Sequence, residues 1–145
     1  MEKITNTICL NMIVKNESHI IRETLENIMA HIPIDYWVIC DTGSTDTTIS
    51  DIISFFEEKK IPGDIHKHEW IDFGTNRTLA LKEAFGKTDY LLIFDADDCF
   101  QGNLILPSEL TRDKYFLKMD GGNYHRPLLV NNRKKWKFRG FFTSI

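Results

Sequence analysis

Short apolar runs alternate with segments of helical periodicity along the first hundred residues of the chain. Four runs rich in β-forming residues are predicted strands: Ile8–Val14, Tyr36–Cys40, Ile65–Trp70 and Tyr90–Phe94. Segments with apolar residues three and four positions apart separate these runs and are predicted helices: Glu17–Met29, Ile49–Phe56 and Thr75–Phe85. Because parallel strands need crossover connections, this alternation predicts an α/β fold, a mainly parallel sheet with helices on both faces.

The ends of these elements carry their own signals. Asn16 or Ser18 is placed to cap the first helix, and Thr48 with Asp51 forms a capping-box pattern at the start of the second. Gly86 follows the third helix, in the position where a glycine commonly ends a helix. The third apolar run contains several charged and polar residues, which predicts an edge strand.

After residue 100 the pattern changes. Three further runs are predicted strands: Tyr115–Met119, Tyr124–Val130 and Trp136–Phe142. Turn residues at Gly121-Gly122 and Asn131-Asn132 join them, which predicts C-terminal antiparallel strands. With 145 residues, 42% of them hydrophobic and 27% charged, the chain has the size and composition of one globular domain.

The charge of the chain bears on its partners. The 18 basic and 21 acidic residues give a formal net charge of −3, which offers no electrostatic case for nucleic acid or an anionic membrane as the main partner. The charge is uneven, however, because residues 133–139 form a basic strip that also contains Trp136 and Phe138.

Cysteine usage and the N-terminal segment predict the compartment. Cys9, Cys40 and Cys99 cannot all pair, and their spacing is not that of metal ligands, so we expect reduced and mostly buried thiols in a reducing compartment. The first apolar run is too short for a signal segment or a membrane span. The sequence therefore predicts an intracellular, cytoplasmic protein without a transmembrane segment.

Polar clusters follow three of the predicted strands. They are Lys15–Glu17 after the first, Asp41–Asp46 after the second and Asp95–Asp98 after the fourth. In parallel α/β sheets, ligands bind at the carboxyl ends of the strands, near a switch in strand order. We therefore expect the three clusters to form one binding site.

Asp95 and Asp97 lie two positions apart, directly after the most hydrophobic strand. Two hard oxygen donors aimed at one point suit Mg²⁺ or Mn²⁺ and leave positions for phosphate oxygens and water. The alternative is an acidic turn that caps the next segment. His66, His68 and His125 do not group with these aspartates and are interpreted as surface residues.

The loop after the second strand can bind a ligand or only connect two elements. Asp41 offers a carboxylate for a base imide or a ribose hydroxyl, and Gly43 is free to adopt an unusual backbone angle. The alternative is a well-formed connection in which Ser44 or Thr45 caps the next helix. Arg77 likewise is either a fixed cation facing phosphate or nucleotide, or a solvated helix arginine.

Four motifs in a fixed order carry a family resemblance. They are Met12–Glu17, Cys40–Asp46, Phe73–Leu81 and Leu92–Asp98. Together they resemble the family 2 glycosyltransferases of GT-A (Rossmann-like) fold, over roughly residues 8 to 100 and more loosely to Phe142. The resemblance implies a nucleotide-diphosphate-sugar donor, most often a UDP-sugar, bound with Mn²⁺ or Mg²⁺. It also implies transfer with inversion to an acceptor, which is a glycan, a protein or a lipid.

The resemblance assigns roles position by position. The donor nucleotide-sugar site comprises Asn16, Glu17, Asp41, Arg77 and Asp95. Within it, Asp41 would contact the uracil or ribose, and Asp95 would lie toward the ribose. Asp97, with Asp95, would ligate the metal. Thr78 is a departure, since the family usually has asparagine after the arginine.

The C-terminal segment departs further from the family pattern. After Gly140 the related sequences continue through a hydrophobic pair to His-Glu, which this chain lacks. An inverting transfer needs a general base, and Asp98, Glu109 and Asp120 are the candidates. We therefore predict a single domain, with residues 1–100 as the nucleotide-sugar-binding part and residues 101–145 as a short or truncated acceptor-side part.

Two other classes of protein share features with this sequence. A phosphatase of the haloacid dehalogenase type also has an Asp-x-Asp motif after a strand, with Asp95 as its nucleophile. That fold places the motif at its first strand, whereas here it follows the fourth. The other alternative is a catalytically impaired module that binds a nucleotide sugar, or a partner protein through its basic strip.

Overall fold

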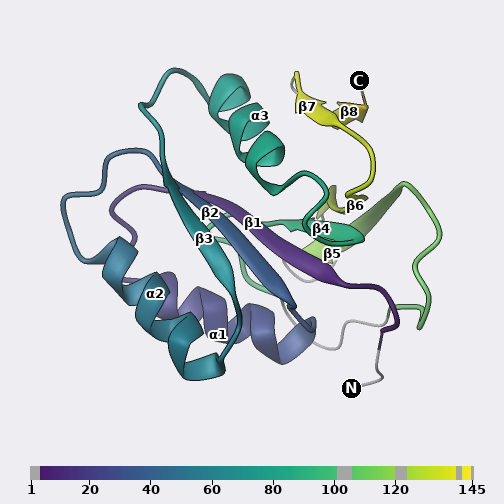
Figure 1. Ribbon diagram of the computed structural model, residues 1–145, viewed down its shortest axis with the longest axis horizontal. Coiled ribbons are helices and arrows are strands. Elements are labelled where there is room, and N and C mark those ends of the chain that lie inside the picture. The colour runs from purple at the N-terminus through teal and green to yellow at the C-terminus, as the bar shows by residue number, and fades with distance from the viewer. Residues whose placement is uncertain (1–3, 101–105, 120–123, 140–141, 145) are drawn as a thin grey trace.

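The computed structural model describes residues 4–100, 106–119, 124–139 and 142–144. Its main-sheet strands are β1 (Ile8–Val14), β2 (Tyr36–Asp41), β3 (Gly63–Lys67), β4 (Tyr90–Ile93), β5 (Lys114–Met119) and β6 (Tyr124–Asn131). In the described residues the spatial order is β3-β2-β1-β4-β6-β5 (Figure 1). The first four strands pair in parallel, whereas β6 pairs antiparallel with β4 and β5. The predicted mixed sheet is confirmed.

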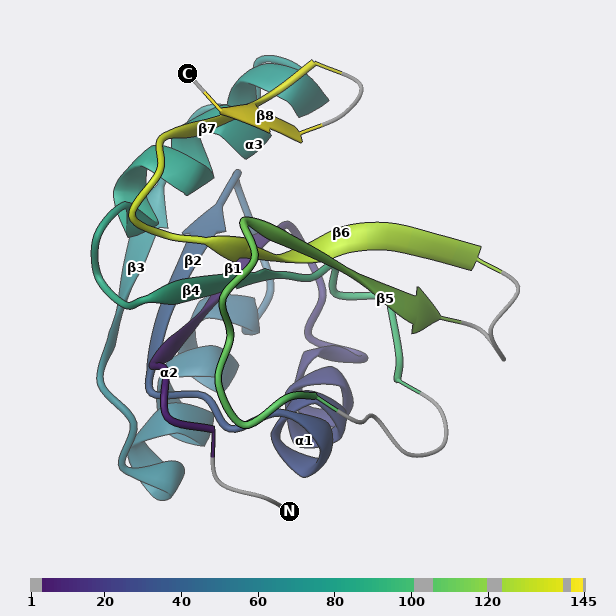
Figure 2. The ribbon, with the colours of Figure 1, turned by 90° about the vertical axis from the view of Figure 1, so that its right-hand side faces the viewer.

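Helices cover both faces of this sheet. The helices α1 (Ile21–His31) and α2 (Thr48–Lys59) lie on one face, and α3 (Phe73–Ala84) lies on the other (Figures 1 and 2). Side chains alternate between the faces, so Leu10 and Leu92 join the core under α1 and α2, while Leu91 joins the core under α3. Each parallel strand is thus buried on two sides, which explains its continuous apolar run.

The chain changes direction across the sheet between β1 and β4. From β1 it passes outward to β2 and β3, then crosses over to pair β4 with the other side of β1. The chain leaves β1 toward α1 on one face and leaves β3 toward α3 on the other, and the strand order reverses between β1 and β4. This is the switch point that favours ligand binding in such sheets.

The polar third strand is an edge strand, as predicted, although it begins and ends earlier than expected. Gly63 lies directly opposite Trp37 in the pairing of β2 and β3. A side chain at this position would bring its Cβ to 2.2 Å from the indole ring. The absence of a Cβ therefore permits the ring of Trp37 to stack on Phe56, with ring centroids 4.8 Å apart.

The predicted N-terminal caps of the first two helices are wrong. Helix α1 begins at Ile21 and has no side-chain cap, because the side chain of Asn16 binds the neighbouring loop instead. The N-cap of α2 is Thr47, whose hydroxyl donates to Asp51, while Thr48 bonds to the loop before the helix. The side chains of Asn16 and Thr48, which the local pattern predicts as helix caps, instead form hydrogen bonds with loop residues.

The C-terminal region is only partly as predicted. Strands β5 and β6 pair as a meander, and the turn expected at Gly121-Gly122 lies outside the described residues. The single strand predicted over Trp136–Phe142 is wrong: β7 (Trp136–Phe138) and β8 (Phe142–Ser144) form a separate two-stranded sheet. The backbone N–H of Phe138 donates to the hydroxyl of Thr78 at 3.1 Å, so β7 packs on α3 rather than joining the main sheet.

The thiols of Cys9 and Cys40 are buried and that of Cys99 is exposed, which agrees with the expected mostly buried set. Burial raises the pKa of both buried thiols to about 12, which keeps them protonated and unreactive. Among the described residues, the helices are all too short or too polar to cross a membrane.

Candidate functional site

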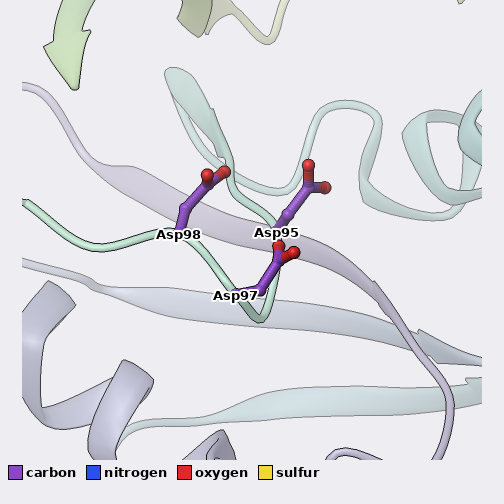
Figure 3. A group of neighbouring side chains, drawn as sticks. All are labelled: Asp95, Asp97 and Asp98. Atoms are coloured by element: carbon purple, nitrogen blue, oxygen red, sulfur yellow. The ribbon is translucent and has the colours of Figure 1, made fainter. Parts of the chain in front are cut away.

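Three carboxylates gather where β4 ends. The backbone N–H of Phe94 still donates to Asn11 in β1, at 3.2 Å, and the chain turns immediately afterwards. Each of Asp95, Asp97 and Asp98 offers one oxygen that lies within 4.8 Å of the others. Figure 3 shows the three side chains extending to the same side of the loop. Oxygen donors at this spacing suit a hard divalent cation, so the two aspartates predicted to bind metal do lie together, with Asp98 beside them.

Arg77 reaches this cluster from the opposite side of the sheet edge. Its side chain is 1% exposed, and its guanidinium donates to Asp95 at 3.0 Å and to Asn11 at 3.4 Å. The amide of Asn11 in turn donates to the carbonyls of Val38 and Ala80. The alternative of a solvated helix arginine is therefore wrong. Arg77 instead ties helix α3 and strand β1 to the first aspartate of the cluster.

Side chains of helix α1 form hydrogen bonds with the backbone of the loop that carries the carboxylate cluster. The hydroxyl of Thr24 donates to the carbonyl of Ala96 at 2.5 Å, and the Asn27 amide group both donates to and accepts from the backbone of Phe100. Neither Thr24 nor Asn27 is among the site residues predicted from the sequence. The available signal was weak: Thr24 is a polar residue on the otherwise apolar stripe of α1, beside Leu25.

Replacing Thr24 by valine keeps the shape of the side chain and removes this hydroxyl. We expect the free energy of unfolding to fall by about 1–2 kcal/mol, because the Ala96 carbonyl loses its buried donor. We also expect the affinity for Mn²⁺ to fall roughly tenfold, since partners that orient a metal-binding loop have effects of that order. Thermal unfolding and Mn²⁺ titration measure the two effects. Ser54→Ala, which removes an exposed hydroxyl from α2, is the control, and an unchanged Mn²⁺ affinity in Thr24→Val would contradict the positioning role.

The loop after β2 is organised by the carboxylate of Asp41, which is 3% exposed. The backbone N–H groups of Gly43 and Ser44 each donate to its Oδ2 at 2.9 Å, and the Ser44 hydroxyl donates to its Oδ1 at 2.5 Å. Gly43 has φ of +118°, the conformational freedom expected of a glycine here. Asp41 thus shapes its own loop at the carboxyl edge, in the position predicted for the donor nucleotide.

Asn16 connects the loops after β1 and β2. It adopts φ of +52°, and its side-chain oxygen accepts from the backbone of Thr45 at 2.7 Å and of Asp46 at 3.3 Å. In the other direction, Asp46 accepts from Thr48 and from the backbone of Ser18. These bonds, first of all those from Thr48, hold the pKa of Asp46 well below its ordinary value. Hydrogen bonds therefore join the polar clusters after β1 and β2 into one continuous surface.

Glu17 lies close enough to the carboxylate cluster for its side chain to interact electrostatically with Asp97. Its backbone N–H donates to the Thr48 hydroxyl at 2.8 Å. Burial raises the pKa of its carboxyl group, the Asp97 and Asp46 carboxylates raise it further, and His19 lowers it. Three loops that are distant in sequence therefore converge at the switch point, as the sequence analysis expected.

The remaining candidates are scattered. Asp98 lies in the carboxylate cluster, Glu109 is exposed, and Asp120 lies outside the described residues. The interpretation of His66 and His68 as plain surface residues is wrong, because both are partly buried and share the carboxylate of Glu83, at 2.9 and 3.1 Å. They join strand β3 and the following loop to α3.

A mainly parallel sheet that antiparallel strands extend is the architecture of the GT-A fold, which similar solved structures share. The chain belongs to glycosyl transferase family 2, whose sequence model matches residues 9–108. This membership removes the haloacid dehalogenase alternative. No curated protein sequence matches the chain.

Solved structures share the fold at low sequence identity. A mannosyltransferase from Pyrobaculum calidifontis, in complex with GDP-Man and Mn²⁺, is 22% identical with a TM-score of 0.57, and the match covers 67% of this chain and 29% of that one. S. aureus TarS in complex with UDP-GlcNAc is 23% identical with a TM-score of 0.52, covering 64% and 27%. Glucosyl-3-phosphoglycerate synthase from Mycobacterium tuberculosis, with Mn²⁺ and UDP-glucose, is 19% identical with a TM-score of 0.50, covering 65% and 34%. The chain thus spans about a third or less of these relatives.

Proposed function

We propose that this chain forms the donor side of a glycosyltransferase that uses a nucleoside-diphosphate sugar, most simply a UDP-sugar, and a divalent cation. The observation that carries the proposal is the convergence of Asp95, Asp97 and Asp98 within 4.8 Å at the switch point, with the buried Arg77 holding the first of them. Family membership supports the same conclusion. Complexes of structurally similar proteins with UDP- and GDP-sugars are consistent with it.

The residues present fit a Mn²⁺ or Mg²⁺ ion. The donors are all carboxylate oxygens, and Asp97 is exposed and so open to phosphate oxygens and water. Asp97 and Asp95 would hold the ion, with Asp98 as a neighbouring ligand. When bound, such an ion neutralises charge on a diphosphate and so stabilises it as a leaving group.

The other predicted donor residues divide into two roles. The carboxylate of Asp95, which Arg77 holds in place, accepts a hydrogen bond from a ribose hydroxyl. Arg77 therefore acts by positioning Asp95 rather than by contact with the nucleotide. The loop that contains Asp41 is hydrogen-bonded to Asn16 and holds the nucleobase. Glu17 lies between this loop and the carboxylate cluster. These assignments rest on the position of each group at the carboxyl edge and on the hydrogen bonds described above.

Transfer with inversion requires a general base opposite the leaving group. Asp98 lies beside the residues that would hold the cation and the leaving diphosphate, which is not the opposite side, so we assign the base to none of the described candidates. The acceptor class remains a glycan, a protein or a lipid. The alternative function is a module that binds the donor without turnover.

Calorimetric titration tests the proposal. UDP, UDP-glucose, UDP-GlcNAc and GDP-mannose are titrated into the protein with Mn²⁺ and again with EDTA. We expect binding of at least one of them with Mn²⁺ and its loss with EDTA, because the diphosphate needs the cation to approach the carboxylates. Absence of metal-dependent binding across the panel would overturn the proposal. Release of nucleoside diphosphate from the bound sugar donor separates an enzyme from a binding module.

A further inference from the structure

A groove of about 350 Å³ lies between α3 and β7. Figures 1 and 2 show β7 running alongside α3. The polar and charged residues that line the groove are Asp72, Thr75, Thr78, Lys82, Lys137 and Arg139. The volume is sufficient for a small polar group such as a phosphate with part of the molecule that carries it.

The groove uses only half of the basic strip at residues 133–139. At the start of the strip, Arg133 pairs with Asp89 and Lys134 pairs with Asp113, each at 2.9 Å. These cations are neutralised and fix the connection between β6 and β7. The strip that is continuous in sequence is therefore divided in the fold, and only its second half faces the groove.

The groove cations have no such partners. Within residues 4–100, 106–119, 124–139 and 142–144, the side chains of Lys82, Lys137 and Arg139 form no ion pair. The one carboxylate in the lining belongs to Asp72, which accepts from the backbone N–H of Thr75 at 2.7 Å. Three cations against one carboxylate leave two positive charges unbalanced, which complements a phosphomonoester dianion.

The groove also offers one hydroxyl donor. The Thr78 oxygen accepts from the backbone of Phe138, which leaves the hydroxyl proton of Thr78 available for a ligand. The hydroxyl of Thr75, at the same wall, is hydrogen-bonded to Asp72. One guanidinium, two ammonium groups and the Thr78 hydroxyl can all donate to phosphate oxygens, and a neutral ligand would leave the positive charges unbalanced.

We propose that this groove binds the phosphate group of a phosphate-bearing acceptor. The inference rests on the proposed function, because only a glycosyltransferase has an acceptor. Arg77 and Thr78 are consecutive in α3, so their side chains project about 100° apart around the helix. The groove therefore lies on a face of α3 that adjoins the face holding Asp95.

The test uses glycerol 3-phosphate as a soluble probe, titrated while the donor site is saturated with UDP and Mn²⁺. We expect binding by the unaltered protein and about a tenfold loss or more in Lys137→Glu/Arg139→Glu, because charge reversal turns attraction into repulsion. Arg112→Glu/Lys135→Glu, a double charge reversal at exposed residues outside the groove, is the matched control and retains binding. The affinity for UDP with Mn²⁺ is expected to be the same in all three proteins.

Sedimentation with vesicles of phosphatidylcholine, with and without phosphatidic acid, identifies the source of the phosphate. Binding of soluble glycerol 3-phosphate supports a small acceptor, and binding only to phosphatidic acid vesicles supports a lipid acceptor, provided that Lys137→Glu/Arg139→Glu loses it. Binding to neither probe, or equal binding by that variant, would overturn the groove assignment. Intact UDP binding in that case leaves the proposed function standing, whereas loss of metal-dependent UDP binding in the unaltered protein contradicts the proposed function itself.

Discussion

Replacing Asp97 by alanine is expected to weaken Mn²⁺-dependent UDP binding by about 100-fold or more. Loss of a residue that merely orients a metal ligand costs 10–100-fold, and removal of a ligand carboxylate should cost at least as much. Asp97 is exposed and is the central member of the carboxylate cluster, so its removal leaves the core unchanged. Calorimetric titration of UDP at fixed Mn²⁺ measures the effect.

The expected loss must be specific to the site. Glu57→Ala removes an exposed carboxylate from α2 and serves as the matched control for the change in net charge. The melting temperature of Asp97→Ala should be unchanged or slightly higher, because one of three mutually repelling carboxylates is gone. Equal UDP affinity in Asp97→Ala and Glu57→Ala would show that the cluster does not bind the metal–nucleotide complex.

Replacing Arg77 by alanine is expected to be the most destabilising single change at the site. The guanidinium is fully buried and holds Asp95 and Asn11, so its removal leaves both without their charged donor and opens a cavity beside α3. We expect the free energy of unfolding to fall by about 3 kcal/mol, the lower end of the range for breaking a buried ion pair, because Asp95 is about a third exposed. Urea unfolding measures the loss.

Two companion variants separate the causes. Arg77→Lys keeps the charge but lacks the forked geometry, and we expect it to recover part of the stability and less of the UDP affinity. Asp95→Asn removes the charge partner while keeping the side-chain shape, and it should lose UDP affinity with a smaller loss of stability. A stable Arg77→Ala protein with normal UDP binding would show that the ion pair has neither role.

The main sheet follows from local sequence patterns with few corrections. The buried strands β1 and β4 are predicted at or close to their observed bounds, because burial on both faces requires an unbroken apolar run. The polar run before α3 is correctly an edge strand. Strand β7 was not separated from β8, because its apolar residues pack on α3, and a short run does not reveal which surface it covers.

The location of the site can be predicted from the sequence, whereas the hydrogen-bond partners of its residues mostly cannot. The clusters after β1, β2 and β4 mark the carboxyl edge, and the structure brings them together there. The supporting role of Thr24 depends on a bond to Ala96, 72 positions away, which local periodicity does not encode. For the same reason, the partner of Asn16 proved to be the loop at Thr45 and not its own helix.

The sequence by itself determined the order of strands and helices and the carboxyl-edge position of the acidic motif, because both depend on the spacing of apolar residues along a short segment. Only the tertiary structure decided which charges neutralise one another. Arg77 proved to be a buried partner of Asp95, and the basic strip divided into paired and unpaired halves. The physical reason is that the energy of a charge depends on its burial and on its neighbours, and those neighbours come from distant parts of the chain.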